Sequence, residues 1–302
     1  MSTVIPKISS LSSRIIRILG CNPSPMTLQG TNTYIIGTGQ KRLLLDCGNP
    51  SVPEYIKLLK DVLKEQNCSL QNIIISHWHL DHIGGVSDVL KELNSDCIVS
   101  KFPRAPGAEN VAKIPDVKFN YLKDGDVIST EGATVRVLAA PGHTDDHLVL
   151  FLEEENSLFS GDCILGEGTA VFEDLYDYML TLEKILKLEP DKIYPGHGPV
   201  IDNPKTKVQD YIQHRMLREK QILEAIESAQ SGGLTSEELV SKIYVGESIQ
   251  DSEFIRDLGV LSTPKYLHKA AEVNVIHHLE KLKKDNIVGE KEADGNLKFV
   301  LL

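Results

Sequence analysis

The first two thirds of the chain alternate short apolar runs with turns rich in Gly, Pro and Asp. Apolar and β-branched runs bounded by turn residues predict strands. The expected strands cover residues 14–19, 33–36, 42–45, 73–75, 97–100, 134–138, 148–152 and 192–194. Between them, apolar residues at helical spacing predict helices over 53–65 and 85–93. Strands in series with intervening helices indicate a layered α/β domain over residues 1–204.

Residues 205–302 have the pattern of a second, mostly helical domain. A polar-rich stretch without Gly or Pro predicts a helix over 205–229. Thr235 and Glu238 have the spacing of a capping box, which predicts the start of a second helix. A third helix over 270–284 and a hairpin in the tail complete a winged-helix-like arrangement. The apolar stripe of the third helix is expected to be Val273, Ile276, Leu279 and Leu282.

Composition narrows the class of protein. The chain has 302 residues, of which 41% are hydrophobic and 25% charged, as in ordinary globular proteins. The longest apolar runs, such as 148–152, are far shorter than the ~20 residues that span a bilayer, so we expect no transmembrane helix. Five scattered cysteines without a CxxC favour a reducing compartment. A net charge of −11 argues against nucleic-acid binding by a general basic surface.

The strongest chemical signal follows the apolar run 73–75, where His77, His79, Asp81 and His82 stand within six positions. Four such side chains converge if the segment forms a tight turn, and Gly84-Gly85 allows close backbone approach there. Imidazoles with a carboxylate suit Zn²⁺ or Fe²⁺ better than Mg²⁺. The segment therefore predicts a metal site.

Three further motifs place one candidate ligand each in a loop at a strand end. His143 lies in PGHT, Asp162 in SGDC and His197 in YPGHGP. Each motif alone is weak, because a single loop histidine is usually solvated. Strand ends bring distant segments together, so the combination indicates one shared centre.

In this order the motifs resemble the metallo-β-lactamase superfamily, with the HxHxDH signature at 77–82 and a match over about residues 14–204. The resemblance implies an αββα sandwich with a dinuclear site at one edge. Asp46 matches the family's first motif, an acid that orients a ligand. The resemblance also implies that His77, His79 and His143 hold one ion, that Asp81, His82 and His197 hold the other, and that Asp162 bridges them.

Longer segments resemble a narrower group in the superfamily, endoribonucleases of the mitochondrial matrix that act on single-stranded RNA. The segments are 19–23, 26–34, 121–126, 141–147, 159–166 and 171–179, and the match runs nearly end to end. It implies an endoribonuclease with two Zn²⁺ per chain, a single-stranded RNA substrate and no membrane partner, as a monomer or weak homodimer. Residues 1–45 lack Asp and Glu, a weak feature of mitochondrial targeting, although 14–20 already has the pattern of a strand. A cytoplasmic location is the alternative.

The chemistry expected of such a centre is hydrolysis. Two dications sharing Asp162 would lower the pKa of a water and present hydroxide to a phosphodiester, which assigns catalytic roles to Asp162 and to Asp81. The acid for the leaving group stays open among Asp145, Asp146 and His147, for which loop-stabilising roles are equally expected.

Other functions share part of this pattern. A thioester hydrolase of the glyoxalase II kind resembles the chain in the same seven ligands, whereas no residue indicates a β-lactam pocket. His79 stands where oxidoreductase members carry Glu, which disfavours a di-iron oxygen reductase. An RNA-binding protein with an inactive site is disfavoured because all seven ligands are present. The tail, 205–302, has 14 Lys and Arg against 16 Asp and Glu, so it is the less acidic part.

Several neighbouring residues carry weaker expectations. Asn32, near the expected mouth of the site, either contacts substrate or stabilises a turn. Trp78 and Cys163 are expected to face away from the metals and to pack. The run 153–155 is an expected hairpin turn, and the acidic residues of 167–177 are expected to cap a helix or to lie on the surface.

Overall fold

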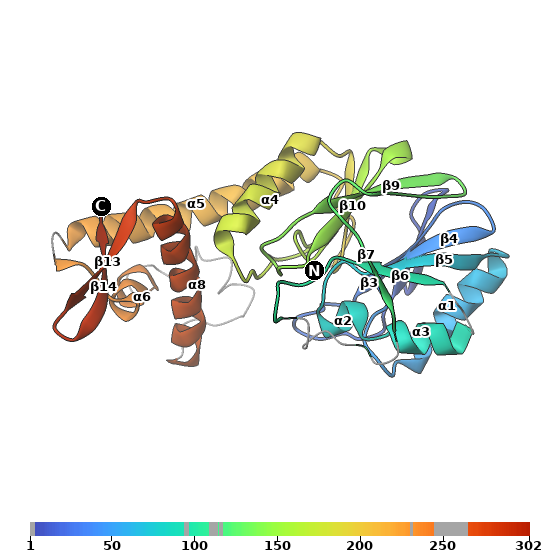
Figure 1. The fold of residues 1–302 in the computed structure, drawn as a ribbon, viewed down its shortest axis with the longest axis horizontal. Coiled ribbons are helices and arrows are strands. Elements are labelled where there is room, and N and C mark those ends of the chain that lie inside the picture. Colours follow the sequence, from blue (N-terminus) through green and yellow to red (C-terminus); the bar gives the residue numbers. More distant parts are fainter. Residues whose placement is uncertain (1–3, 94–96, 109–113, 115–116, 230–231, 245–264) are drawn as a thin grey trace.

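The structure is a computed structural model that describes residues 4–93, 97–108, 114, 117–229, 232–244 and 265–302. Two sheets face each other in its larger part, and a smaller, helix-rich part follows at the C-terminal end (Figure 1). No helix in these ranges is both long and apolar enough to cross a membrane.

The first sheet is built entirely from the first 121 residues, in chain order. Its first four strands pair antiparallel, and β4 to β7 run parallel, which requires crossover connections. Helices α1 (Pro53–Glu65) and α3 (Val86–Leu93) supply two of these connections. The strands are β1 (Ile8–Ser10), β2 (Ile15–Leu19), β3 (Asn32–Ile36), β4 (Lys41–Leu45), β5 (Ser69–Ile74), β6 (Ile98–Lys101) and β7 (Phe119–Tyr121).

The second sheet has the order β12-β11-β10-β9-β8. Its strands are antiparallel except for β11 and β12, which are parallel and are linked through helix α4 (Leu175–Leu188). The acidic run Glu153–Glu155 and Asn156, at φ 43°, turn the chain between β10 and β11, as expected. The strands are β8 (Val127–Thr130), β9 (Ala133–Ala139), β10 (Leu148–Leu152), β11 (Ser157–Gly161) and β12 (Lys192–Pro195).

Three apolar layers hold this part together. Tyr34, Leu150 and Phe159 belong to the layer between the two sheets. Leu59 of α1 packs on the outer face of the first sheet, and Leu182 of α4 on that of the second. Because helices cover both outer faces, the αββα sandwich expected from the sequence is confirmed.

The C-terminal part begins with the long helix α5 (Pro204–Ser228), whose start lies on the sandwich (Figure 1). Helices α6 (Ser236–Tyr244) and α8 (Lys265–Lys284) and the hairpin β13 (Val288–Ala293) and β14 (Asn296–Leu301) form its own core. The capping box is confirmed, since Glu238 N donates to Thr235 Oγ1 at 3.1 Å and Thr235 N donates to Glu238 Oε2 at 2.8 Å. The order of helices α5, α6 and α8 and the terminal hairpin is that of the winged-helix arrangement expected from the sequence.

The expected strands are all present, although β5 begins at Ser69 rather than at residue 73. The expectation missed β1, β7, β8 and β11, in which serine, asparagine or threonine leaves only one or two apolar residues in a row. It also missed α4, although its buried residues Leu175, Tyr178, Leu182 and Ile185 have helical spacing. Asp174 caps this helix by accepting from Asp177 N, which confirms the capping role expected of the acidic segment.

The expected stripe on the third helix was wrong for two of its four members. Val273 is 51% exposed and Ile276 40%, whereas Leu279 and Leu282 are buried. Val275 lies on the buried face in their place. The buried face of this helix is therefore rotated from the expected stripe by about one residue position. Spacing gives the period of an apolar stripe, but it does not fix which side of the stripe the rest of the small domain covers.

Candidate metal centre

The candidate ligands all lie in loops at the strand ends of one edge of the sandwich. His77 and His79 follow β5, and the short helix α2 (Leu80–Ile83) carries the next two. His143 lies between β9 and β10, and Asp162 and His197 follow β11 and β12. A side chain at Gly85 would collide with the Cys47 carbonyl, so glycine is required where this turn meets β4. The fold thus brings all seven predicted residues together.

The first group consists of three imidazoles. His77 Nε2 lies 2.9 Å from His79 Nδ1, and His143 Nε2 lies 3.3 Å from His77 Nε2 and 3.1 Å from His79 Nδ1. Asp162 Oδ2 is 3.9 Å from His143 Nε2. One nitrogen from each ring and one carboxylate oxygen therefore face a common point.

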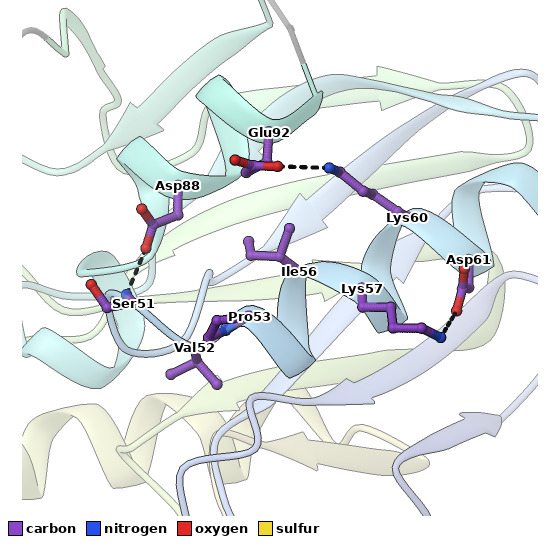
Figure 2. A pocket seen from close by; sticks show the side chains of 9 residues that line it. All are labelled: Ser51, Val52, Pro53, Ile56, Lys57, Lys60, Asp61, Asp88 and Glu92. Carbon is purple, nitrogen blue, oxygen red and sulfur yellow. Dashed lines mark hydrogen bonds and ion pairs between the residues drawn. The ribbon is translucent and has the colours of Figure 1, made fainter.

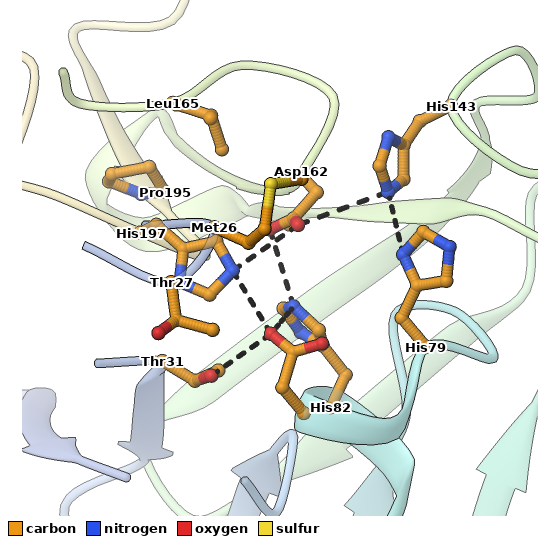
Figure 3. A network of polar contacts seen from close by, with 12 residues as sticks. Met26, Thr27, Thr31, His79, His82, His143, Asp162, Leu165, Pro195 and His197 are labelled. Carbon is orange, nitrogen blue, oxygen red and sulfur yellow. Dashed lines mark hydrogen bonds and ion pairs between the residues drawn. The ribbon is translucent and has the colours of Figure 1, made fainter. Parts of the chain in front are cut away.

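The second group shares Asp162 with the first (Figure 3). His82 Nε2 lies 3.2 Å from Asp81 Oδ2 and 3.3 Å from Asp162 Oδ1. His197 Nε2 lies 3.1 Å from Asp81 Oδ2 and 3.3 Å from Asp162 Oδ2. Two ions bound in this arrangement would have Asp162 between them.

The donor atoms fit divalent cations. His82 Nε2 and Asp162 Oδ1 are buried and lie 3.3 Å apart, but neither makes a hydrogen bond among the described residues. Buried polar atoms without partners are costly unless a further group satisfies them. A Cβ at Gly196 would collide with Asp162 Oδ1, so this glycine keeps the space beside the carboxylate open. Imidazole and carboxylate are the donors that zinc prefers among oxygen and nitrogen ligands.

The two ligand groups differ in the pKa values of their histidines, which are lowered in the first group and raised at His197 in the second. Burial, together with the neighbouring histidines, lowers the pKa of His77 well below its usual value and that of His79 to about 4, so both rings are neutral. Burial opposes the charge on Asp162, but His197 and His82 outweigh it and keep the pKa of this carboxyl well below its usual value. Burial is likewise outweighed at His197, where Asp162 and Asp81 raise the pKa to about 9. Neutral imidazoles and ionised carboxylates are the states that bind metal, so His77 and His79 are ready to bind, whereas His197 must first release a proton.

A shell of hydrogen bonds fixes the orientation of the ligands. Asp46, held at φ 61°, accepts from Ser76 N, Ser76 Oγ and His82 Nδ1, each at 2.8 Å. His143 Nδ1 donates to Val171 O at 2.7 Å. These contacts fix which ring nitrogen points inward, and the orienting role expected of Asp46 agrees with its contact to His82.

Two residues of this shell were not assigned such roles from the sequence. His147, fully buried, accepts from Asp162 N at 3.2 Å through Nε2, so it supports the shared carboxylate. Asn32 is also fully buried and donates to the carbonyls of Pro195 and Gly198, both at 2.9 Å. Its side chain holds the loop of His197 and does not face the mouth of the site. The second histidine of the 143–147 segment was the available signal for His147.

The other candidates for the leaving-group acid are engaged in structural contacts. Asp146 is buried and lies 3.0 Å from Lys101 Nζ. Asp145 accepts from Arg104 Nε at 2.7 Å and from Ala105 N at 2.8 Å. Their contacts support the loop-stabilising reading.

Two neighbours of the ligands pack as expected, although the Trp78 ring also lies 4.6 Å from the ring of His79. Cys163 is fully buried in the apolar layer beneath α4. Trp78 packs beneath Arg104, whose guanidinium carbon lies 4.4 Å from the ring centroid.

Exposed aliphatic residues neighbour the ligands in the chain or contact them: Leu80 stands between His79 and Asp81, and the carbonyl of Val171 accepts from His143. Met26 is also exposed and is drawn in front of the cluster in Figure 3.

A groove of about 420 Å³ lies apart from this cluster, between α1 and α3 (Figure 2). Its lysines are paired, Lys57 with Asp61 at 2.8 Å and Lys60 with Glu92 at 2.7 Å. None of the seven clustered residues lines it, so the groove is separate from the candidate centre.

Known proteins are similar to this chain in sequence or in fold. Residues 26–197 match the metallo-beta-lactamase superfamily domain, and residues 262–295 match the beta-lactamase associated winged helix domain. The Beta-lactamase-like protein 2 homolog of Drosophila melanogaster is 47% identical over 93% of this chain and 92% of its own. The Atrochrysone carboxyl ACP thioesterase of Aspergillus fumigatus is 40% identical over 80% of this chain and 76% of its own. A beta-lactamase domain protein from Burkholderia ambifaria has the same fold, with a TM-score of 0.76 at 15% identity, over 98% of this chain and 93% of its own.

Proposed function

Because this chain belongs to the metallo-beta-lactamase superfamily of hydrolases, we propose that it is a zinc-dependent endoribonuclease that cleaves single-stranded RNA. The observation that carries the proposal is the pair of ligand groups sharing Asp162. The similarity to the Drosophila Beta-lactamase-like protein 2 homolog spans both domains and not the metal motifs alone, so it supports membership of the narrower group that the sequence segments resemble. The choice of RNA as substrate rests on that resemblance.

In this proposal His77, His79 and His143 hold one zinc ion, and Asp81, His82 and His197 hold the other. Asp162 belongs to both sets. Two such ions supply Lewis acidity and a water of lowered pKa, which is the chemistry that phosphodiester hydrolysis requires.

In this proposal, side chains of the protein orient the water and the substrate. Asp81 is the ligand of its group with the most exposed side chain, at 20%, and Thr31 Oγ1 donates to its Oδ2 at 3.2 Å. We assign Asp81 the task of orienting water and substrate at the mouth. Asp162 N donates to His147 Nε2, and this contact fixes the residue that the two ligand groups share. The exposed Met26 and Val171 offer apolar surface to the bases of a flexible strand.

A thioester hydrolase is the second candidate function. The Aspergillus relative carries that activity in its name and is 40% identical over 80% of this chain. The exposed aliphatic side chains near the ligands suit an acyl chain as well as a base. Both substrates would use the same seven ligands.

One assay separates the two candidates. The purified protein, with Zn²⁺ or with a chelator, is incubated with labelled single-stranded RNA, double-stranded RNA and S-lactoylglutathione. We expect zinc-dependent cleavage of the single strand only. Thioester turnover without RNA cleavage would replace the proposal by the second candidate.

Variants then link the activity to the centre. Asp81→Ala and His79→Ala are expected to abolish cleavage while circular dichroism shows a folded protein. Asp61→Ala, at the separate groove, is the matched control and retains activity. Full activity in either ligand variant would contradict the metal mechanism.

The setting of the protein is part of the same proposal. We propose the mitochondrial matrix, with the cytoplasm as the alternative, and a monomer or weak homodimer. Subcellular fractionation and sedimentation at several concentrations test these two points.

A further inference from the structure

Side chains on one face of α5 contact the loop that follows Asp162. Lys207, Tyr211 and Arg215 are spaced four residues apart, so they lie along one side of the helix. Lys207 Nζ and Tyr211 Oη donate to Gly168 O at 3.2 and 3.0 Å. Arg215 Nη2 donates to Ala170 O at 2.9 Å. Helix α5 therefore binds two carbonyls of this loop, those of Gly168 and Ala170.

The same loop positions a candidate metal ligand. Val171 O, one residue beyond the carbonyl that Arg215 binds, accepts from His143 Nδ1 at 2.7 Å. The next residue, Phe172, lies under the Arg215 guanidinium at 4.8 Å and stacks on Tyr178 at 5.3 Å. One arginine thus contacts the Ala170 carbonyl before Val171 and the Phe172 ring after it. His143 depends on the Val171 carbonyl for the direction of its ring.

Helix α8 reaches the same segment from the other side. The edge of His277 meets the Phe172 ring at 5.4 Å, and Lys284 Nζ lies 2.5 Å from Asp174 Oδ2. Asp174 in turn caps α4. The contacts of 170–174 with the C-terminal part therefore come from two of its helices.

Arg215 is the central member of these contacts. It is only 5% exposed, and in the described part of the chain it makes polar contacts with Ala170 O and His214 Nδ1, neither of them a carboxylate. A buried guanidinium without a carboxylate is held in place by its carbonyl and ring contacts. Removing it would leave Ala170 O without this donor and Phe172 without its cover.

We propose that Arg215 is a positioning residue through which the C-terminal part sets the metal affinity of the His77, His79 and His143 group. Among the described residues, no side chain of Asp81, His82 or His197 bonds a carbonyl of 163–174, and the loop meets this group where Gly166 N donates to the backbone carbonyl of His197 at 2.9 Å. We therefore expect Arg215 to leave the affinity of this group unchanged. The inference rests on the proposed metal centre.

Arg218 provides a matched control one turn further along α5. It is 9% exposed, and its guanidinium carbon lies 4.3 Å from the Tyr244 ring within the C-terminal part. The two arginines are alike in burial and in their aromatic contact. Only Arg215 bonds a carbonyl of the loop.

The test is a titration of the metal-free full-length protein with Co²⁺, followed by its visible absorption. In Arg215→Ala we expect one of two equivalents to bind about 10-fold more weakly and the other to bind as before. Arg218→Ala binds both as the wild type does, even where its melting temperature falls. Unchanged binding in Arg215→Ala, or equal weakening of both equivalents, would overturn the inference.

Two further measurements cover the remaining outcomes. If Arg215→Ala does not fold, Arg215→Lys keeps one donor for Ala170 O but cannot stack flat, and we expect an intermediate loss. Nitrogen NMR of the histidine rings in the metal-free protein reports the His143 tautomer directly. A wild type that binds no Co²⁺ would contradict the proposed metal centre, whereas an unchanged His143 signal in the Arg215 variants would contradict the positioning role.

Discussion

Asp46 shows how a single buried carboxylate organises the candidate centre without belonging to the ligand set. It accepts from the backbone and hydroxyl of Ser76 and from His82 Nδ1, so it fixes both the start of the ligand loop and the direction of one ring. Outer contacts of this kind typically change metal affinity or activity by 10–100-fold when they are removed.

We therefore expect Asp46→Asn to bind metal at the Asp81, His82 and His197 group about 10–100-fold more weakly. The amide presents only one acceptor oxygen where the carboxylate presents two, so the Ser76 and His82 contacts cannot all be kept. Metal titration measures the effect, and Asp61→Asn at the surface is the control. Wild-type affinity in Asp46→Asn would contradict the orienting role.

At the residue scale the sequence predicted the members of the cluster but not all of their supports. The seven candidate ligands stand in short motifs with unusual composition, so they are visible one by one. Asn32 and His147 act through the carbonyls and amides of distant loops. Such contacts depend on which strand ends become neighbours, and that is settled only when both sheets are assembled.

At the element scale, strong local signals were sufficient and weak ones were not. The capping box before α6 and the Pro-initiated α1 are specified by a few adjacent residues. The buried face of α8 depends on where α6 and the hairpin lie, and this is why Val273 and Ile276 were wrongly placed in the core. A helical stripe gives the period of a helix more reliably than the direction of its contact.

The corrected face of α8 gives a stability prediction. Leu279 is fully buried in the core of the C-terminal part, so Leu279→Ala should lower the unfolding free energy by about 2–5 kcal/mol. Ile276 is 40% exposed on the same helix, and Ile276→Ala should cost less than about 1.5 kcal/mol. Urea unfolding of the two variants measures the difference. Equal losses of unfolding free energy in the two variants would show that Ile276 contributes to the core as much as Leu279 does.

At the scale of the whole molecule, the cluster ties the two sheets together, since its ligands come from β5 and from loops of the second sheet. Metal that binds only the folded state stabilises it, by about 2.7 kcal/mol per site at free metal 100 times Kd. We expect chelation to lower the melting temperature by several degrees and Zn²⁺ to restore it. Calorimetry measures this, and Asp162→Asn, which disturbs both groups, should show a much smaller rise with Zn²⁺. The same rise in the variant would place the bound metal elsewhere.

The acidity of the chain leads to the last prediction, which concerns how RNA is captured. The net charge is −11, and two cations beside the segment of His143 are paired, Lys101 with Asp146 and Arg104 with Asp145. Binding of single strands falls with salt with a slope of about −0.7 per phosphate contact. Because the metals rather than a basic surface would attract the strand, we expect log(kcat/KM) to fall with log[KCl] with a slope no steeper than about −2, or roughly three contacts. Metal content is measured at each salt concentration as the control. A slope near −5 would indicate a basic binding surface and move the capture step from the metal centre to the rest of the chain.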